Sequence, residues 1–137
     1  MARPTSLDAK ATLSLTLTVR PDELTGVRRR VIQSVRADGF GAIADDVGLV
    51  VGELLTNVHE HAEGVCEVEI HRAGARLVVR VSDTVPTPPT TLRHRPDGTA
   101  ESGRGLLIVD ALTECWHTTL TPTGKVITCV FRIPSGR

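Results

Sequence analysis

Residues 42–62 read AIADDVGLVVGELLTNVHEHA and predict one long helix around which the rest of the chain folds. Asp45 and Asp46 suit the positive N-terminal end of such a helix, and Gly64 ends it. Its apolar positions recur at helical spacing and are Ile43, Val47, Val50, Val51, Leu54, Leu55 and Val58. Because this apolar surface is wide, the helix must pack against a sheet or another helix.

A polar stripe interrupts that apolar surface at Glu53, Asn57 and His61, which follow one another at intervals of four residues. A carboxamide oxygen can bind Mg²⁺, and a carboxylate can orient or deprotonate a hydroxyl. The alternative is that the stripe simply faces solvent, as one side of most helices does. His59 and His61 point in opposite directions on a helix, so they do not form a metal pair.

The remaining elements are predicted from alternating or helical patterns. Strands are expected at 11–19, 65–72, 75–82, 115–121 and 125–133, and further helices at 21–39 and 103–114. Tight turns at Ala73-Gly74 and Thr123-Gly124 indicate hairpins. We therefore expect an α+β two-layer sandwich, with a mixed, mainly antiparallel sheet and three helices on one face.

Two further features could serve a ligand. Gly103-Arg104-Gly105 opens the last helix, where backbone N–H groups can approach a phosphate, although a flexible hinge is the alternative. Asp83 ends an apolar strand and could accept a hydrogen bond from an exocyclic amine such as that of adenine, or merely form a turn. A loop with four prolines and no periodicity separates these two features, and such long loops are usually functional.

Length and composition limit the class of protein. The 137 residues fit a flexible segment at 1–10 and a single domain at 11–137. Zero net charge argues against broad binding to nucleic acid or to anionic membranes, and 2% aromatic residues argue against a base-stacking surface. There is no run of about 20 apolar residues that could span a bilayer. Three widely spaced cysteines indicate reduced thiols and a cytoplasmic location.

The order of the motifs is more specific than any one of them. ELLTN at 53–57 lies on a helix, Asp83 ends a strand, a long loop follows, and SGRGL at 102–106 opens a helix. This order resembles the N, G1 and G2 boxes of the GHKL ATPase superfamily, which has the Bergerat ATP-binding fold. The short chain most resembles the anti-sigma-factor, serine-protein-kinase branch found in many bacteria. The resemblance covers roughly residues 11–133.

The resemblance implies a role for each motif. Asn57 would bind the Mg²⁺ that bridges the ATP phosphates, Glu53 would activate a serine hydroxyl, and Asp83 would bind the adenine amine. Residues 84–102 would form the ATP lid. The phosphates would be wrapped by Ser102, Gly103, Arg104, Gly105 and Leu106.

The implied function is an ATP-binding anti-sigma factor and serine/threonine protein kinase. Such a protein sequesters a sigma factor, phosphorylates an antagonist protein on serine, and contacts neither nucleic acid nor membrane directly. Relatives of this branch commonly form dimers through the first strand and the first helix, so a homodimer is compatible with the resemblance.

Two departures from the family pattern leave an alternative open. The usual D-x-G of the G1 box reads Asp83-Thr84-Val85, without the glycine. Glu101 precedes Ser102 where kinase-competent relatives can carry an arginine, so only Arg104 supplies positive charge there. The alternative is a non-catalytic binding module of the same fold that regulates a sigma factor or antagonist by protein–protein contact. A third hypothesis is a structural α/β domain without a ligand site.

Overall fold

The computed structural model describes residues 11–61, 65–84 and 101–134, with the backbone alone at residues 11, 59–61 and 101–106. The elements are β1 Ala11–Thr18, the 3-10 turn η1 Pro21–Glu23, α2 Leu24–Ala37, α3 Gly41–His61, β2 Val65–Ala73, β3 Arg76–Asp83, α4 Glu101–Leu112, β4 Cys115–Thr121 and β5 Gly124–Arg132. This order of strands and helices is the one that the sequence patterns predict.

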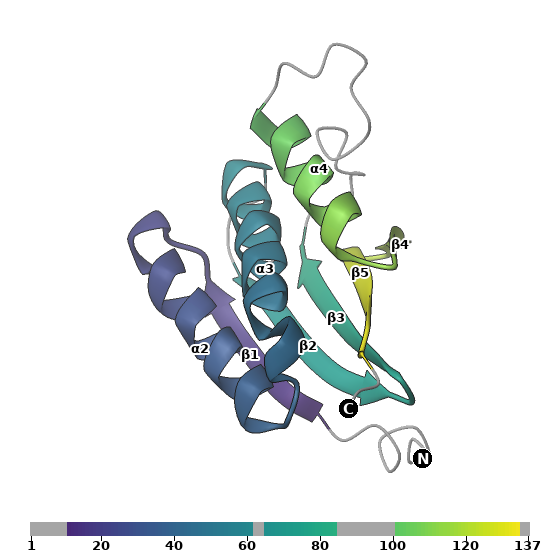
Figure 1. Cartoon of the computed structure of the whole chain (residues 1–137). Helices are drawn as coiled ribbons and strands as arrows, with labels where there is room; N and C mark the ends of the chain where they lie inside the picture. The colour runs from purple at the N-terminus through teal and green to yellow at the C-terminus, as the bar shows by residue number, and fades with distance from the viewer. Residues whose placement is uncertain (1–10, 62–64, 85–100, 135–137) are drawn as a thin grey trace, which may run out of the picture.

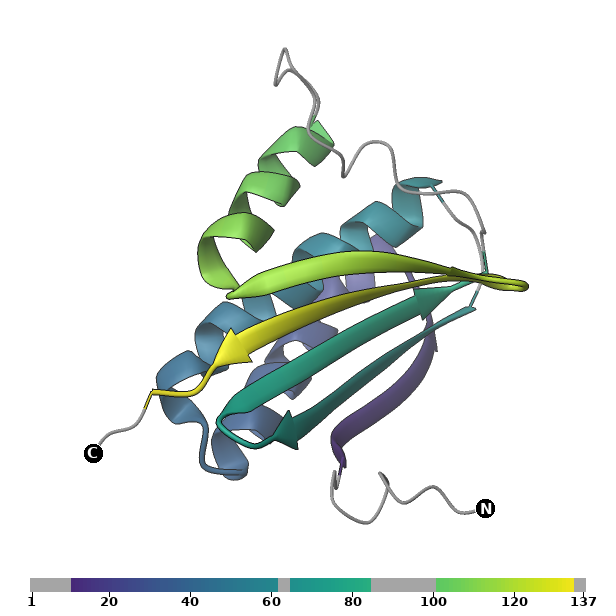
Figure 2. The same cartoon turned by 90° about the vertical axis from the view of Figure 1, so that its right-hand side faces the viewer.

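The five strands form one sheet in the order β1-β2-β3-β5-β4, and every neighbouring pair is antiparallel. Figure 2 shows the sheet in front of α2 and α3. The predicted α+β two-layer sandwich is confirmed. Among the described strands no parallel pair occurs, since tight hairpins join β2 to β3 and β4 to β5.

The hydrophobic core lies between the sheet and the helices (Figure 1). On β2, Cys66, Val68 and Ile70 are buried, while Glu67 and Glu69 between them are exposed. The period of two places alternate side chains on opposite faces, so one face of the sheet meets the helices and the other meets solvent. No helix in the described part of the chain is long and apolar enough to cross a membrane.

Two glycines on α3 allow α2 to pack closely against it. A Cβ on Gly48 would run into the side chain of Ile32, and a Cβ on Gly52 would crowd that of Arg28. The absence of side chains at these two positions therefore makes room for large residues of α2.

Most predicted boundaries are wrong by one to three residues, and three of these shifts concern the turns and the start of the last helix. Ala73 pairs with Arg76, so the first hairpin turn is Gly74 with residue 75, and Gly74 has the positive φ of 65° that such turns need. Thr121 pairs with Gly124, so residues 122–123 form the second turn and Gly124 already belongs to β5. The last helix begins at Glu101, because an acidic residue and a serine suit a first helical turn.

Candidate functional site

Asn57 is a polar side chain placed inside an apolar region of α3. It is only 5% exposed, and its neighbours Leu54, Leu55 and Val58 belong to the core. Glu53, one turn earlier, is partly buried. The interpretation of the stripe as a solvated face is therefore wrong for Asn57, whereas the side chain of His61 lies outside the described residues. A buried carboxamide is costly unless it is hydrogen-bonded.

Asp83, the last residue of β3, forms a buried ion pair with Lys125 of β5. The Lys125 Nζ atom lies 2.7 Å from the Asp83 Oδ2 atom, and the two side chains are 3% and 2% exposed. The two residues face each other directly in the antiparallel ladder. Sequence reasoning missed Lys125, although a lysine at the start of an otherwise apolar strand is an unusual signal.

A row of polar groups crosses three strands at this edge of the core. Glu67 pairs with Ser82, which places the preceding Cys66 beside Asp83, and Asp83 pairs with Lys125. Cys66, Asp83 and Lys125 each lie an even number of positions from the buried hydrophobic residues of their own strand. Their side chains therefore lie on the face of the sheet that the helices cover. Burial, followed by the negative charge of Asp83, raises the pKa of the Cys66 thiol to about 11. The thiol is therefore uncharged at neutral pH.

The predicted phosphate-binding residues Ser102 to Leu106 lie in the first turns of α4, whose backbone is helical from Glu101. Their side chains, and residues 85–100 of the predicted lid, lie outside the described part of the structure. The N-terminal turn of a helix offers backbone N–H groups to an anion. Because α4 contacts α3, these N–H groups belong to a helix that packs on the one carrying Glu53 and Asn57.

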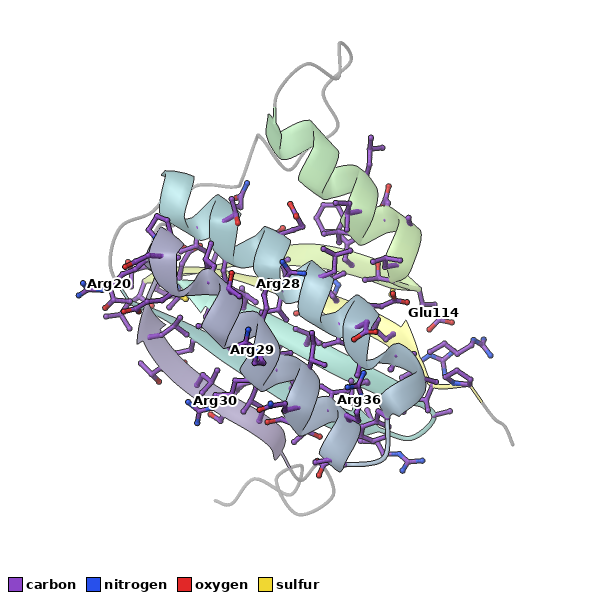
Figure 3. All side chains as sticks on the ribbon, turned by 60° about the vertical axis from the view of Figure 1, so that its left-hand side comes forward. Arg20, Arg28, Arg29, Arg30, Arg36 and Glu114 are labelled. Carbon is purple, nitrogen blue, oxygen red and sulfur yellow. The ribbon has the colours of Figure 1, made fainter. Side chains whose placement is uncertain are left out.

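A basic hollow of about 350 Å³ lies elsewhere, along the side of α2 that carries Arg28 and Ile32, next to α3. Figure 3 shows the arginines of this helix as sticks. Among the described residues, the buried Nε atom of Arg28 finds no hydrogen-bond partner. The hollow is lined by Thr25, Arg28, Arg29, Ile32, Gln33 and Arg36. Since none of Glu53, Asn57 and Asp83 lines it, this hollow is separate from the candidate nucleotide site.

Asn57, Asp83 and the start of α4 have the chemistry expected for a magnesium nucleotide. A carboxamide oxygen is a hard ligand suited to Mg²⁺, a carboxylate can accept from a base amine, and a helix N-terminus suits phosphate. In Figure 1 the C-terminal ends of α3 and β3 and the N-terminal end of α4 point toward the same end of the molecule. Asn57 and the start of α4 therefore fit the phosphate end of the group, whereas at the base end Asp83 is already paired with Lys125, a residue that the motif does not include.

Comparisons with known proteins bear on the family and the fold. Residues 17–131 match the family described as the histidine kinase-like ATPase domain. The fold is similar to that of a chain in the SiaB–SiaC complex from Pseudomonas aeruginosa, with a TM-score of 0.69, 15% identity and 93% of each chain covered.

A second similar structure is the histidine kinase domain of the blue-light activated histidine kinase EL346 from Erythrobacter litoralis. Its TM-score is 0.51 at 22% identity, with 80% of this chain and 61% of that chain covered. A search of curated proteins found no match. The match over residues 17–131 spans most of the sequence, and the chain belongs to the histidine kinase-like ATPase domain family.

Proposed function

We propose that this chain binds ATP with Mg²⁺ and acts as a regulatory serine/threonine protein kinase and anti-sigma factor in the cytoplasm. The observation that carries the proposal is that Asn57 and Asp83 stand in the motifs that resemble the N and G1 boxes, in a chain that belongs to the histidine kinase-like ATPase domain family. Both residues are buried, at 5% and 8% exposure.

Each residue would have one task in this site. The Asn57 carboxamide oxygen would hold Mg²⁺, which when bound neutralises charge between the phosphates. Glu53, partly buried one turn away, would accept the proton of a serine hydroxyl. Asp83 would face the base, and the first turns of α4 would hold the phosphates through backbone N–H groups.

A non-catalytic binding module remains a second candidate, favoured by a specific feature of the base end. The Asp83 side chain is 2% exposed and already ion-paired with Lys125. Together with Glu101 beside the phosphate motif, this pairing is consistent with weak nucleotide use. Such a module would regulate its partner by contact alone.

The partner in either case would be a protein, either a sigma factor or its antagonist. Helix α2 has four arginines and no acidic residue: Arg29 and Arg30 are exposed, Arg28 is half-buried, and Arg36 pairs with Asp45 of α3 at 3.3 Å, so the exposed face of the helix is basic (Figure 3). Such a face favours an acidic partner surface. Two copies that paired through the same arginines would repel each other, which makes this part of α2 a poor choice for a homodimer contact.

Phosphate transfer separates the two candidates. The protein would be incubated with Mg²⁺ and ATP labelled at the γ-phosphate, together with antagonist-type domains encoded beside its gene. The kinase proposal predicts labelled serine that is lost in Glu53→Gln and retained in Asp46→Asn, an exposed carboxylate on the same helix. Absence of transfer in the wild-type protein, with nucleotide binding intact, would leave only the binding module.

A further inference from the structure

We propose that Lys125 competes with the nucleotide base for Asp83, so that Asp83 does not accept a hydrogen bond from the adenine amine while the ion pair is intact. This inference rests on the proposed nucleotide site. It concerns Lys125, which lies outside the ATPase motifs, and it predicts that the 6-amino group of the base adds little to the affinity for nucleotide.

The geometry of the ladder sets up the competition. Asp83 and Lys125 are direct cross-strand partners, and their charged atoms lie 2.7 Å apart, which is the distance of a full charge-assisted hydrogen bond. Gly124 fixes the approach of the two strands, because a Cβ at this position would collide with the backbone carbonyl of Asp83. Lys125 is therefore held beside the carboxylate by the backbone as well as by charge.

The chemistry of the two donors favours the lysine. The ammonium group and the carboxylate carry opposite full charges, so Coulomb attraction adds to their hydrogen bond, whereas a neutral donor to the same carboxylate lacks this attraction. The exocyclic amine of adenine is a neutral donor, so it does not replace the ammonium on equal terms. Displacing Lys125 would also leave an ammonium group without this partner in a place where its side chain is 3% exposed.

Burial adds a second obstacle. The Asp83 side chain is only 2% exposed, so a base cannot contact the carboxylate in this arrangement without moving a neighbouring group. We infer that affinity for nucleotide comes from the phosphate end of the site, at Asn57 and the start of α4. The 6-amino group of the purine would then contribute little to the affinity.

The direct test compares two ligands on the wild-type protein. ATP and purine riboside triphosphate, which has hydrogen in place of the 6-amino group, would each be titrated with Mg²⁺ in a calorimeter. We expect their Kd values to agree within about threefold, the scale of the weakest net hydrogen bonds. A preference for ATP of about tenfold or more would show that the amine reaches a charged acceptor, and would overturn the inference.

Substitution of Lys125 gives an independent test with a matched control. Lys125→Met removes the charge and keeps a similar chain length, so this variant should prefer ATP over the amine-free analogue by about tenfold. Lys125→Arg retains a cation and should bind ATP and the amine-free analogue with similar Kd values. The ligand-induced rise in Tm provides a second measure, because only ATP should strongly stabilise Lys125→Met.

The outcomes separate this inference from the proposed function. Equal binding of both ligands by the wild type and by Lys125→Met would overturn the competition while leaving the nucleotide site in place. Failure of every variant to bind either ligand would remove the nucleotide site, and the inference with it. If Lys125→Met does not fold, the comparison of the two ligands on the wild-type protein decides alone.

Discussion

Strands β3 and β5 are held together by charged residues at both ends, and the two ends differ in their access to water. At one end the register partners Asp83 and Lys125 form a pair whose side chains are 2% and 3% exposed. At the other end the register partners Arg76 and Arg132 carry like charges, and Glu114 bridges them with side chains that are 31–68% exposed. The same type of contact thus occurs once in the core and once at the surface.

The difference in burial decides what each contact does. At the exposed end, Glu114 accepts from the Nε of Arg76 at 2.6 Å and from the Nη2 of Arg132 at 3.4 Å, and water can replace either arginine. At the buried end both side chains are shielded from water, so the loss of one partner leaves the charge of the other without compensation from solvent. A buried ion pair is weak evidence for added stability, because the cost of desolvating the two charges can exceed their attraction. We therefore relate this pair to ligand recognition.

Removal of one partner at the buried end should have the largest effect on folding. Lys125→Met leaves the Asp83 carboxylate without its cation in the core and should lower the free energy of unfolding by ~3–5 kcal/mol. The double variant Asp83→Leu with Lys125→Met should recover most of this loss. Urea unfolding followed by circular dichroism would measure both, and a loss in the single variant below ~1 kcal/mol would contradict the assignment of a buried pair.

Thiol reactivity should distinguish the buried cysteines, Cys66 and Cys129, from the exposed Cys115. Cys66 lies beside Asp83, and burial raises its pKa from 9.0 to about 11, which lowers its thiolate fraction about a hundredfold. Burial likewise raises the pKa of Cys129 to about 12, whereas Cys115 beside Glu114 is exposed. A chromogenic disulfide reagent at pH 8 should find one fast thiol in the folded protein and three after denaturation.

The identity of the fast thiol is checked by Cys115→Ser, which should remove the rapid phase. A rapid phase that persists in this variant would show that the Cys66 or Cys129 thiol is open to solvent, and reaction at Cys66 would contradict the buried row of Cys66, Asp83 and Lys125.

The close approach at the buried end should be sensitive to a single methyl group. Gly124→Ala places a Cβ against the backbone carbonyl of Asp83, which cannot move as a side chain could, so we expect a loss of ~1–3 kcal/mol in stability. The matched control is Gly26→Ala on α2, where no atom lies within 4 Å of the added Cβ. The control should be neutral or stabilising by up to ~1 kcal/mol. Equal Tm values for the two variants would refute the tight contact.

Substitution at the exposed end should have the smallest effect, with a defined pH dependence. The hydrogen bond from Arg76 lowers the pKa of Glu114 from its ordinary value of 4.5, and Arg132 acts in the same direction. Since the pKa is lower in the folded state, the stabilisation is present above about pH 4.5 and is lost as the pH falls through the lowered value. Glu114→Gln should slightly lower Tm at pH 7 and match the wild type at acidic pH. A deficit that is the same at both pH values would contradict a charge-based contact.

The sequence predicts the elements and the polar positions of the site better than it predicts their partners. Periodicity locates α3 and places Glu53 and Asn57 on one stripe, since both depend on local spacing. The contact of Asp83 with Lys125 depends on the register between β3 and β5, which residues far apart in the chain determine together. The second hairpin turn joins β4 to β5, so even its exact position would not have shown that Lys125 faces Asp83.

The burial of a side chain also could not be predicted from the spacing of residues in the sequence. Asn57 and Glu53 lie one turn apart, yet Asn57 is buried and Glu53 only partly so, because the two side chains meet different neighbours in the packed structure. A helical pattern gives the direction of a side chain but not the depth of the elements that cover it.

Calorimetric titration with ATP in the presence and absence of Mg²⁺ is the sharpest test of a nucleotide site built around Asn57. We predict saturable, Mg²⁺-dependent binding by the wild type, a loss of about tenfold or more in Asn57→Ala, and no change in Asp45→Asn, an exposed carboxylate at the other end of α3. All three proteins would first be shown to be folded. Binding that is independent of Mg²⁺, or equal in the wild type and Asn57→Ala, would contradict a nucleotide site built around Asn57.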